Sequence, residues 1–258
     1  MLPRAPFVLV LLLNLLLATL GQQPVMAQDS ADEKKHREKC IQSLKQLGAT
    51  VFMRGQHVVE VSANRIKITD DQLQLVSRFS KMTDLSLEGT KIGDAGLAHL
   101  HALKKLEWLN LYRCDIGDAG LKSLQGLKNL RHLPIGETKV TDDGLVHLQK
   151  MKQLVYLGLR GDKISDKGLQ HLSTLTKLQG LHLGETAVTD EGLKHLLLMR
   201  KLSKLWLSNT AVTDGAVDHL AKLRSLRELH VEQSKMTAKG VKRLRALLPR
   251  CRVVDQSE

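Results

Sequence analysis

The chain has 258 residues, of which 42% are hydrophobic but only 3% are aromatic, and its formal net charge at pH 7 is +12. Because aromatic residues are scarce, leucine has to build the core, which excludes a core of packed aromatic rings and already suggests a repeat protein. Three cysteines far apart in the sequence, Cys40, Cys114 and Cys251, do not make a disulfide framework.

Residues 1–27 have the pattern of a cleaved secretory signal. A basic start, MLPR, precedes an apolar run from Phe7 to Leu20, and Val25-Met26-Ala27 fits a cleavage site of small residues. This run is shorter than the ~20 residues that a membrane span requires. We therefore expect export to the periplasm, the cell surface or the extracellular space, with no stable membrane span after cleavage. An uncleaved N-terminal anchor is the alternative.

Residues 28–58 are expected to cap the N-terminal end of the repeats. Ser30 and Glu33 have the spacing of a capping box, and an apolar stripe follows at helical spacing up to Leu47. Gly48 ends this predicted helix, and ATVFMRGQHVVEV then predicts a β-hairpin.

From residue 59 to 252 the chain repeats itself with a period of 24 residues. Seven copies without insertions begin at Leu85, Leu109, Leu133, Leu157, Leu181, Leu205 and Leu229, and a degenerate copy begins near Val59. Residues 253–258 remain as a C-terminal tail. In each LxL the two leucines point into the core and the residues beside them point out, because side chains alternate along a strand.

The repeat resembles the leucine-rich repeat, whose core LxxLxLxx(N/C)xL is filled here by Leu106, Leu109, Leu111, Cys114 and Ile116. The pattern TxITDxGLxxL is similar to the repeats of secreted bacterial, planctomycete-type proteins and of F-box proteins, although no F-box precedes it. Threonine replaces the Asn/Cys residue in four copies, at Thr90, Thr138, Thr186 and Thr210. The resemblance implies an α/β solenoid, a right-handed arc with parallel strands on the concave face and helices on the convex face.

Three columns of the repeat consist of residue types that are also found in catalytic, metal-binding or phosphate-binding sites. They are a histidine column (His99, His147, His171, His195, His219), an aspartate column (Asp94, Asp118, Asp142, Asp166, Asp190, Asp214) and a glycine column (Gly96, Gly120, Gly144, Gly168, Gly192, Gly240). The histidines lie too far apart to share a metal. Each aspartate is expected at the positive end of a helix whose N-terminus is capped by threonine. Each glycine is expected to make a close packing contact. Cys114 is expected to be buried and inert. We therefore predict no catalytic residues, no metal and no cofactor.

The segment LEWLNLYRC, residues 106–114, indicates the binding face. Leu109 and Leu111 point inward, so Trp108, Asn110 and Tyr112 point onto the concave face, as do Tyr156 and Trp206. The predicted ligand-binding residues are Trp108, Asn110, Tyr112, Arg113, His132, Tyr156, Arg160, His182 and Trp206. Acids gather at the two ends, at Glu60, Asp84, Glu88, Glu228 and Glu232, which leaves an aromatic and basic middle. The alternative is that these are ordinary exposed strand residues.

These patterns predict a secreted, non-catalytic module that binds a protein partner through its concave face, since Trp, Tyr and Arg dominate interface hot spots. Two alternatives remain: binding of an anionic polysaccharide or cell-surface glycan, and a structural role in an envelope or matrix. The positive charge favours acidic glycans, anionic surfaces or acidic proteins over nucleic acid. A basic C-terminal cluster (Lys235, Lys239, Lys242, Arg243, Arg245, Arg250, Arg252) is expected to be the solvated face of the last helix, and a dedicated anion site is the alternative.

Overall fold

The computed structural model describes residues 31–256. The predicted signal peptide and the start of the capping box lie outside the described residues. The chain divides into two units, residues 1–38 and 39–258, of which the structure describes residues 31–38 and 39–256. This division does not test the predicted limits of the cap, the repeat domain and the tail. α2 (Ala31–Gln46) begins in the first unit and ends in the second, where its Cys40 and Leu44 are buried. The predicted N-terminal helix is therefore confirmed.

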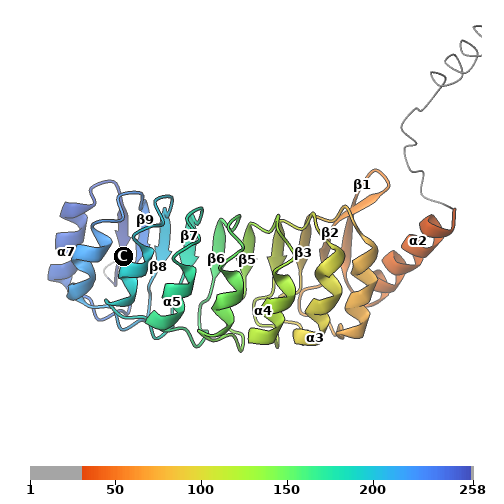
Figure 1. The fold of residues 1–258 in the computed structure, drawn as a ribbon, viewed down its shortest axis with the longest axis horizontal. Coiled ribbons are helices and arrows are strands. Elements are labelled where there is room, and N and C mark those ends of the chain that lie inside the picture. The colour runs from red at the N-terminus through yellow and green to blue at the C-terminus, as the bar shows by residue number, and fades with distance from the viewer. Residues whose placement is uncertain (1–30, 257–258) are drawn as a thin grey trace, which may run out of the picture. The chain divides into compact units, whose positions relative to one another are not determined.

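The second unit is built on a sheet of ten strands that follow one another in chain order (Figure 1). β1 (Thr50–Arg54) and β2 (His57–Ser62) form the expected antiparallel hairpin, which turns at Gly55 and Gln56. All later strands are parallel: β3 (Asp84–Ser86), β4 (Trp108–Asn110), β5 (His132–Pro134), β6 (Tyr156–Gly158), β7 (Gly180–His182), β8 (Lys204–Trp206), β9 (Glu228–His230) and β10 (Arg252–Val254). Each strand is in register with its neighbour 24 residues on, so the sequence columns become columns in space.

Helical segments return the chain along one side of this sheet. They are η1 (Asp71–Arg78), α3 (Asp94–Leu97) with η2 (Ala98–Ala102), α4 (Asp118–Leu124), η3 (Gly144–Leu148), α5 (Asp166–Leu172), η4 (Gly192–Leu196), η5 (Asp214–Ala216) with α6 (Val217–Leu220), and α7 (Ala238–Leu247). The segments labelled η are 3₁₀ helices, which are narrower than α-helices and so suit a short repeat. The other side of the sheet carries no helix of the described chain, and we call it the open face.

The core consists of the repeat leucines, as predicted. Leu109, Leu111, Leu157 and Leu159 are each 0% exposed, and Phe79 is the only buried aromatic ring of the described core. The apolar side of the sheet and the apolar stripes of the helices thus enclose one continuous core between them. Within residues 31–256 no helix is both long enough and apolar enough to cross a lipid bilayer.

The aspartate column begins helices, as predicted for Asp94, Asp118 and Asp166, and it also has a second role. Asp118 Oδ1 accepts from the backbone N–H of Thr141 at 2.8 Å, and its Oδ2 accepts from the Thr141 hydroxyl at 2.7 Å. The same backbone bond to the next repeat is made by Asp70, Asp94, Asp142, Asp166, Asp190 and Asp214. The prediction of a dipole interaction was incomplete, because these carboxylates chiefly join each repeat to the next.

The glycine column makes room for these carboxylates. A Cβ on Gly120 would lie only 2.5 Å from Asp94 Oδ1, which is closer than real Cβ contacts allow. The other glycines of the column face the aspartate of the preceding repeat in the same way. The predicted close packing at these glycines is therefore explained by the aspartate bridge.

Candidate functional site

The predicted binding residues do lie on the open face. Trp108, Tyr112, Tyr156 and Trp206 are half-buried, whereas Arg113 and Arg160 are exposed. The rings are only half-exposed, although they point onto the face as predicted, because the side chains of neighbouring repeats pack against one another across strands that are about 4.8 Å apart.

A pocket of about 300 Å³ opens in the middle of this face. Its lining residues are Tyr112, Pro134, Gly136, Tyr156, Gly158, Arg160 and His182. The structure therefore brings together four of the predicted residues, Tyr112, Tyr156, Arg160 and His182, around one hollow.

Three lining residues, Pro134, Gly136 and Gly158, were missed by the sequence analysis. Gly158 stands in the column of His182 and Trp206, and Gly136 in that of Tyr112 and Arg160, so the hollow exists because these two glycines have no side chains to fill it. Gly136 is also required by the backbone, since a Cβ would lie 2.6 Å from the carbonyl oxygen of Arg160. A run of small residues in otherwise bulky columns was the signal that could have revealed the pocket.

Aromatic rings pack beside the pocket. The indole of Trp206 stacks between the imidazoles of His182 and His230, with ring centroids 5.3 and 5.7 Å apart, and meets Tyr156 edge-on at 6.3 Å. Burial lowers the pKa of His182 to about 4, and the nearby positive charges of Arg160 and His230 act in the same direction. His182 is therefore neutral at neutral pH and adds no positive charge to the face.

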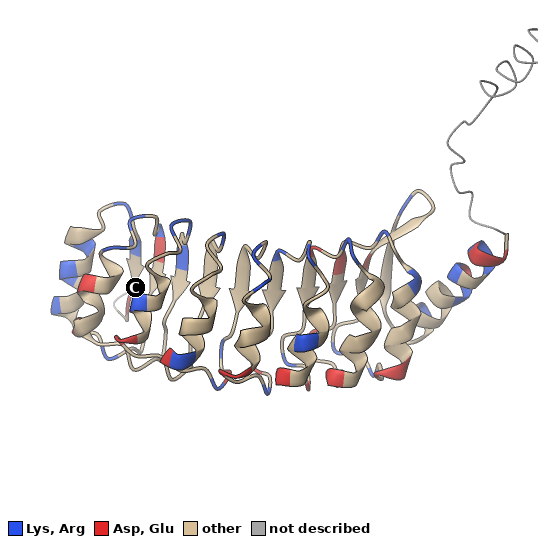
Figure 2. Cartoon of the chain, viewed as in Figure 1, with Lys and Arg blue, Asp and Glu red and all other residues tan. Residues whose placement is uncertain are grey.

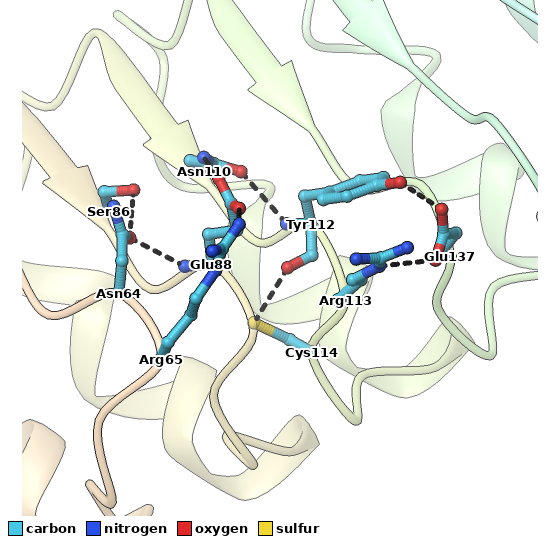
Figure 3. A network of polar contacts seen from close by, with 9 residues as sticks. All are labelled: Asn64, Arg65, Ser86, Glu88, Asn110, Tyr112, Arg113, Cys114 and Glu137. Atoms are coloured by element: carbon cyan, nitrogen blue, oxygen red, sulfur yellow. Dashed lines mark hydrogen bonds and ion pairs between the residues drawn. The ribbon is translucent and has the colours of Figure 1, made fainter.

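The middle of the face is not basic, which corrects the prediction that acids gather only at its ends. Arg113 Nε lies 2.5 Å from Glu137 Oε2, and Arg160 Nη2 lies 2.6 Å from Glu185 Oε1. Tyr112 donates its hydroxyl to Glu137 as well (Figure 3). The hydrogen bonds from Arg113 and Tyr112 lower the pKa of Glu137. Both arginines are thus compensated by carboxylates that the sequence analysis had passed over.

These charged residues stand on unusual backbone. Arg113, Glu137 and Glu185 have φ values of 58°, 54° and 60°, in the left-handed region that favours glycine. The same column contains Gly89 and Gly161, also with positive φ. Non-glycine residues in this conformation cost roughly 1–2 kcal/mol each, so the stacked repeats must impose it.

Asn110 is not a free binding residue, contrary to the prediction. It is buried, its Oδ1 accepts from the backbone N–H of Tyr112 at 3.0 Å, and its Nδ2 donates to Glu88 Oε2 at 3.3 Å. Glu88 also pairs with Arg65 at 3.0 Å (Figure 3). Asn110 therefore closes the turn after β4 from within.

Trp108 and His132 lie opposite each other on β4 and β5, on the open face but outside the pocket lining. Trp206 also lies outside the lining, although it touches two lining rings.

The histidine column and Cys114, whose residue types also occur in metal or catalytic sites, have surroundings that fit a structural role. No group of three or more His, Cys, Asp or Glu residues in the described chain could hold a metal ion. The rings of His147 and His171 each meet a glutamine of the preceding repeat, Gln125 and Gln149. Cys114 is buried, which raises the pKa of its thiol, and its Sγ donates to the Leu87 carbonyl at 3.1 Å.

One buried ionisable group was missed. Asp162 occupies the column position of Thr90 and Thr186, is 3% exposed, and accepts from the backbone and hydroxyl of Thr138 through Oδ1. Its Oδ2 is buried without a hydrogen-bond partner, and burial raises its pKa to about 7.

A family model described as Leucine Rich repeat matches residues 102–124. Among solved structures, internalin C2 from Listeria monocytogenes is similar, with 19% identity, a TM-score of 0.55, and coverage of 78% of this chain and 92% of that one. The ectodomain of the Arabidopsis receptor kinase HAESA, solved with a peptide hormone ligand, has 16% identity and a TM-score of 0.64, over 87% of this chain and 41% of that one.

The ectodomain of GASSHO1/SCHENGEN3 from Arabidopsis thaliana, solved with CASPARIAN STRIP INTEGRITY FACTOR 2, has 15% identity and a TM-score of 0.54, over 81% of this chain and 26% of that one. No curated protein matches the chain in sequence. At these identities the likeness concerns the fold. The chain is a leucine-rich-repeat solenoid, a scaffold that generally binds and does not catalyse. The finer resemblance to planctomycete-type and F-box repeats stays a prediction.

Proposed function

We propose that the protein is an exported binding module whose open face holds an extended segment of a protein partner, with one aromatic or large apolar side chain of that segment in the pocket. The pocket is the observation that carries this proposal. The signal-like sequence at residues 1–27 and the resemblance to secreted bacterial repeat proteins support export.

The size and walls of the pocket suit a single side chain. A cavity of about 150 Å³ already holds benzene, and pockets for whole small molecules begin at about 300 Å³. The pocket has about 300 Å³, two tyrosine rings and a proline in its lining. These walls suit an aromatic or large apolar anchor.

The surroundings suit a peptide backbone. The ion pairs of Arg113 with Glu137 and of Arg160 with Glu185 place donors and acceptors beside the pocket without a large net charge. Such an arrangement can satisfy the N–H and C=O groups of an extended chain. The peptide hormone bound to the HAESA ectodomain provides a precedent in the same fold.

The same ion pairs disfavour an anionic polysaccharide on this face. Arg113 and Arg160, the arginines on which that alternative depends, already have carboxylate partners. A polyanion would have to displace Glu137 and Glu185 before it could gain their charge.

A displayed peptide library, selected on the immobilised protein, tests the proposal. We expect the selected sequences to share an aromatic or large apolar residue, and Tyr112→Ala to weaken their binding at least tenfold. Trp108→Ala is the matched control, because it removes a half-buried aromatic ring of the same face outside the pocket. Peptides without such a residue, or equal binding by Tyr112→Ala and the parent protein, would refute the proposal.

A further inference from the structure

One edge of the second unit is strongly basic. It is formed by the turns that lead from each helix to the next strand, at residues 78–83, 102–107, 126–131, 150–155, 174–179, 198–203, 222–227 and 248–252, and we call it the basic edge. Its bases, all of them exposed, are Arg78, Lys81, Lys104, Lys105, Lys128, Arg131, Lys150, Lys152, Lys177, Arg200, Lys201, Lys222, Arg224, Arg227, Arg250 and Arg252. The same turns contain a single carboxylate, Glu107.

Acids of the described chain neutralise few of these bases. Of the bases of this edge, and leaving Arg252 aside, only Arg131 forms an ion pair with an acid of residues 31–256. Its partner is the exposed Glu107, at 3.5 Å. The opposite edge carries the aspartate column, and Figure 2 shows acidic residues gathered there at the starts of the helices. The repeats therefore separate positive from negative charge across the unit, in contrast to the paired charges of the open face.

Exposed apolar side chains accompany the basic edge. Glu60 is in register with Asp84, so β2 begins three residues before the level at which β3 starts. The hairpin therefore projects past this edge (Figure 1), with Phe52 and Met53 each 46% exposed. Leu198, which is 61% exposed, lies in one of the basic turns, two residues before Arg200.

Two hollows lie between turns of this edge. One, of about 390 Å³, has Leu197, Met199 and Leu223 in its walls together with Arg200, Lys222, Arg224 and Ser225. The other, of about 230 Å³, combines Leu226, Leu247, Leu248, Pro249 and Cys251 with Arg224 and Arg250. Each hollow thus combines apolar walls with guanidinium or ammonium groups, and Arg224 belongs to both.

We propose that the basic edge docks the protein on the surface of an anionic phospholipid membrane. Lysine and arginine rows are attracted by anionic headgroups, and neighbouring apolar side chains enter the headgroup boundary. Met53, Phe52 and Leu198 are the apolar side chains available for this, and the two hollows accept headgroup phosphates. A soluble polyanion would also contact the bases but would gain nothing from a projecting apolar hairpin. This docking would leave the open face free.

Vesicle co-sedimentation of the full chain tests the proposal. Vesicles that contain phosphatidylglycerol are compared with vesicles of phosphatidylcholine alone, which report any contribution from the apolar N-terminal segment. In the test variant, Lys105, Lys128, Lys152 and Lys201 are all replaced by Gln. In the matched control, Lys91, Lys139, Lys163 and Lys235 on the opposite edge, which are also exposed, are replaced by Gln.

We expect the parent protein to prefer the anionic vesicles. The test variant should lose affinity about fivefold per base, or several hundredfold in all, and the control much less. At high salt the charges are screened, and Met53→Ser should weaken the vesicle binding that remains. Val146→Ser, which changes an exposed apolar residue of a helix, should not. Three results would overturn the proposal: no preference for anionic vesicles, equal losses in the two quadruple variants, or tight binding to heparin with no difference between Met53→Ser and Val146→Ser on vesicles.

Discussion

Asp162 shows how a single residue can depart from its column with a measurable cost. At the equivalent positions Thr90, Thr186 and Thr210 donate to a carbonyl three residues earlier, as Thr186 does to Leu183 at 2.6 Å, whereas Thr138 donates to Asp162 itself. The buried carboxyl of Asp162 has instead a pKa raised to about 7, above the ~3.9 of an unfolded aspartate. The folded protein therefore holds a proton that the unfolded chain has released.

The sign of the pH dependence follows from this raised pKa. The contribution of Asp162 to stability is fully present below about pH 4 and is lost as the pH rises through about 7. Between pH 6 and 8 we expect the free energy of unfolding of the parent to fall by about 1–2 kcal/mol more than that of Asp162→Asn. Urea denaturation at both pH values measures this. Identical pH profiles would show that the carboxyl is not desolvated.

Trp206 is a second residue whose structural surroundings change the expectation. As a surface residue its truncation would leave stability within about 0.5 kcal/mol. Because the indole stacks between His182 and His230, we expect Trp206→Ala to lower the free energy of unfolding by about 1–2 kcal/mol. Chemical denaturation measures the loss, and a variant as stable as the parent would contradict the stacked arrangement.

At the scale of elements, neighbouring helical segments are linked by the hydrogen bonds between each aspartate and the next repeat, in place of the contacts that long helices would make. Gly144→Ala would push a Cβ against Asp118, whose carboxylate holds Thr141. We expect this variant to lose about 1–3 kcal/mol of unfolding free energy, through overpacking and a strained hydrogen bond.

Gly117→Ala is the matched control for this prediction. Its added Cβ would lie 3.6 Å from Asp94 Oδ2, an ordinary contact, and its backbone has no positive φ. Thermal melts of both variants should separate them clearly. Equal melting temperatures would mean that the glycine column does not serve the bridge.

The sequence predicted the parts of each element that depend on local pattern. The period of 24 placed the strands and the buried leucines, and the alternation in ATVFMRGQHVVEV placed the hairpin, because alternation and turn residues are written locally. It did not predict the bridge, since the partner of Asp118 lies 23 residues away and becomes a neighbour only when repeats stack. The choice between α and 3₁₀ helices was missed for a similar reason, as tertiary packing decides it.

The candidate site was predicted in part, again for physical reasons. Alternation along the strands put Tyr112, Tyr156, Arg160 and His182 on one face, and these four line the pocket. The pocket itself depends on residues with small side chains, such as Gly158. The prediction relied on aromatic and charged residues, and a glycine is neither. The ion pairs were missed because Glu137 follows its strand in a left-handed turn, a position that strand alternation does not describe.

At the scale of the whole molecule, the second unit presents two surfaces with different chemistry. The open face has paired charges around an aromatic pocket, and the basic edge has exposed positive charges beside apolar side chains. In repeat proteins each repeat contacts mainly its neighbours, and these contacts determine stability. One surface can therefore be altered while the other is kept. This separation allows the central claim, that the pocket receives a side chain of a protein partner, to be tested alone.

The most direct test fills the pocket without removing any side chain. A Cβ on Gly158 would lie 3.1 Å from the hydroxyl of Tyr156, so the tyrosine ring has to shift by only a few tenths of an ångström, and Gly158→Leu should fold and occupy the hollow. Gly126→Leu is the control, because its Cβ would lie at the same 3.1 Å from the flexible Lys104 Nζ, away from the pocket. Isothermal titration with a selected peptide should show at least a tenfold loss of affinity for Gly158→Leu and none for Gly126→Leu, both with melting temperatures close to the parent's. A folded Gly158→Leu that binds the peptide as tightly as the parent would contradict the account.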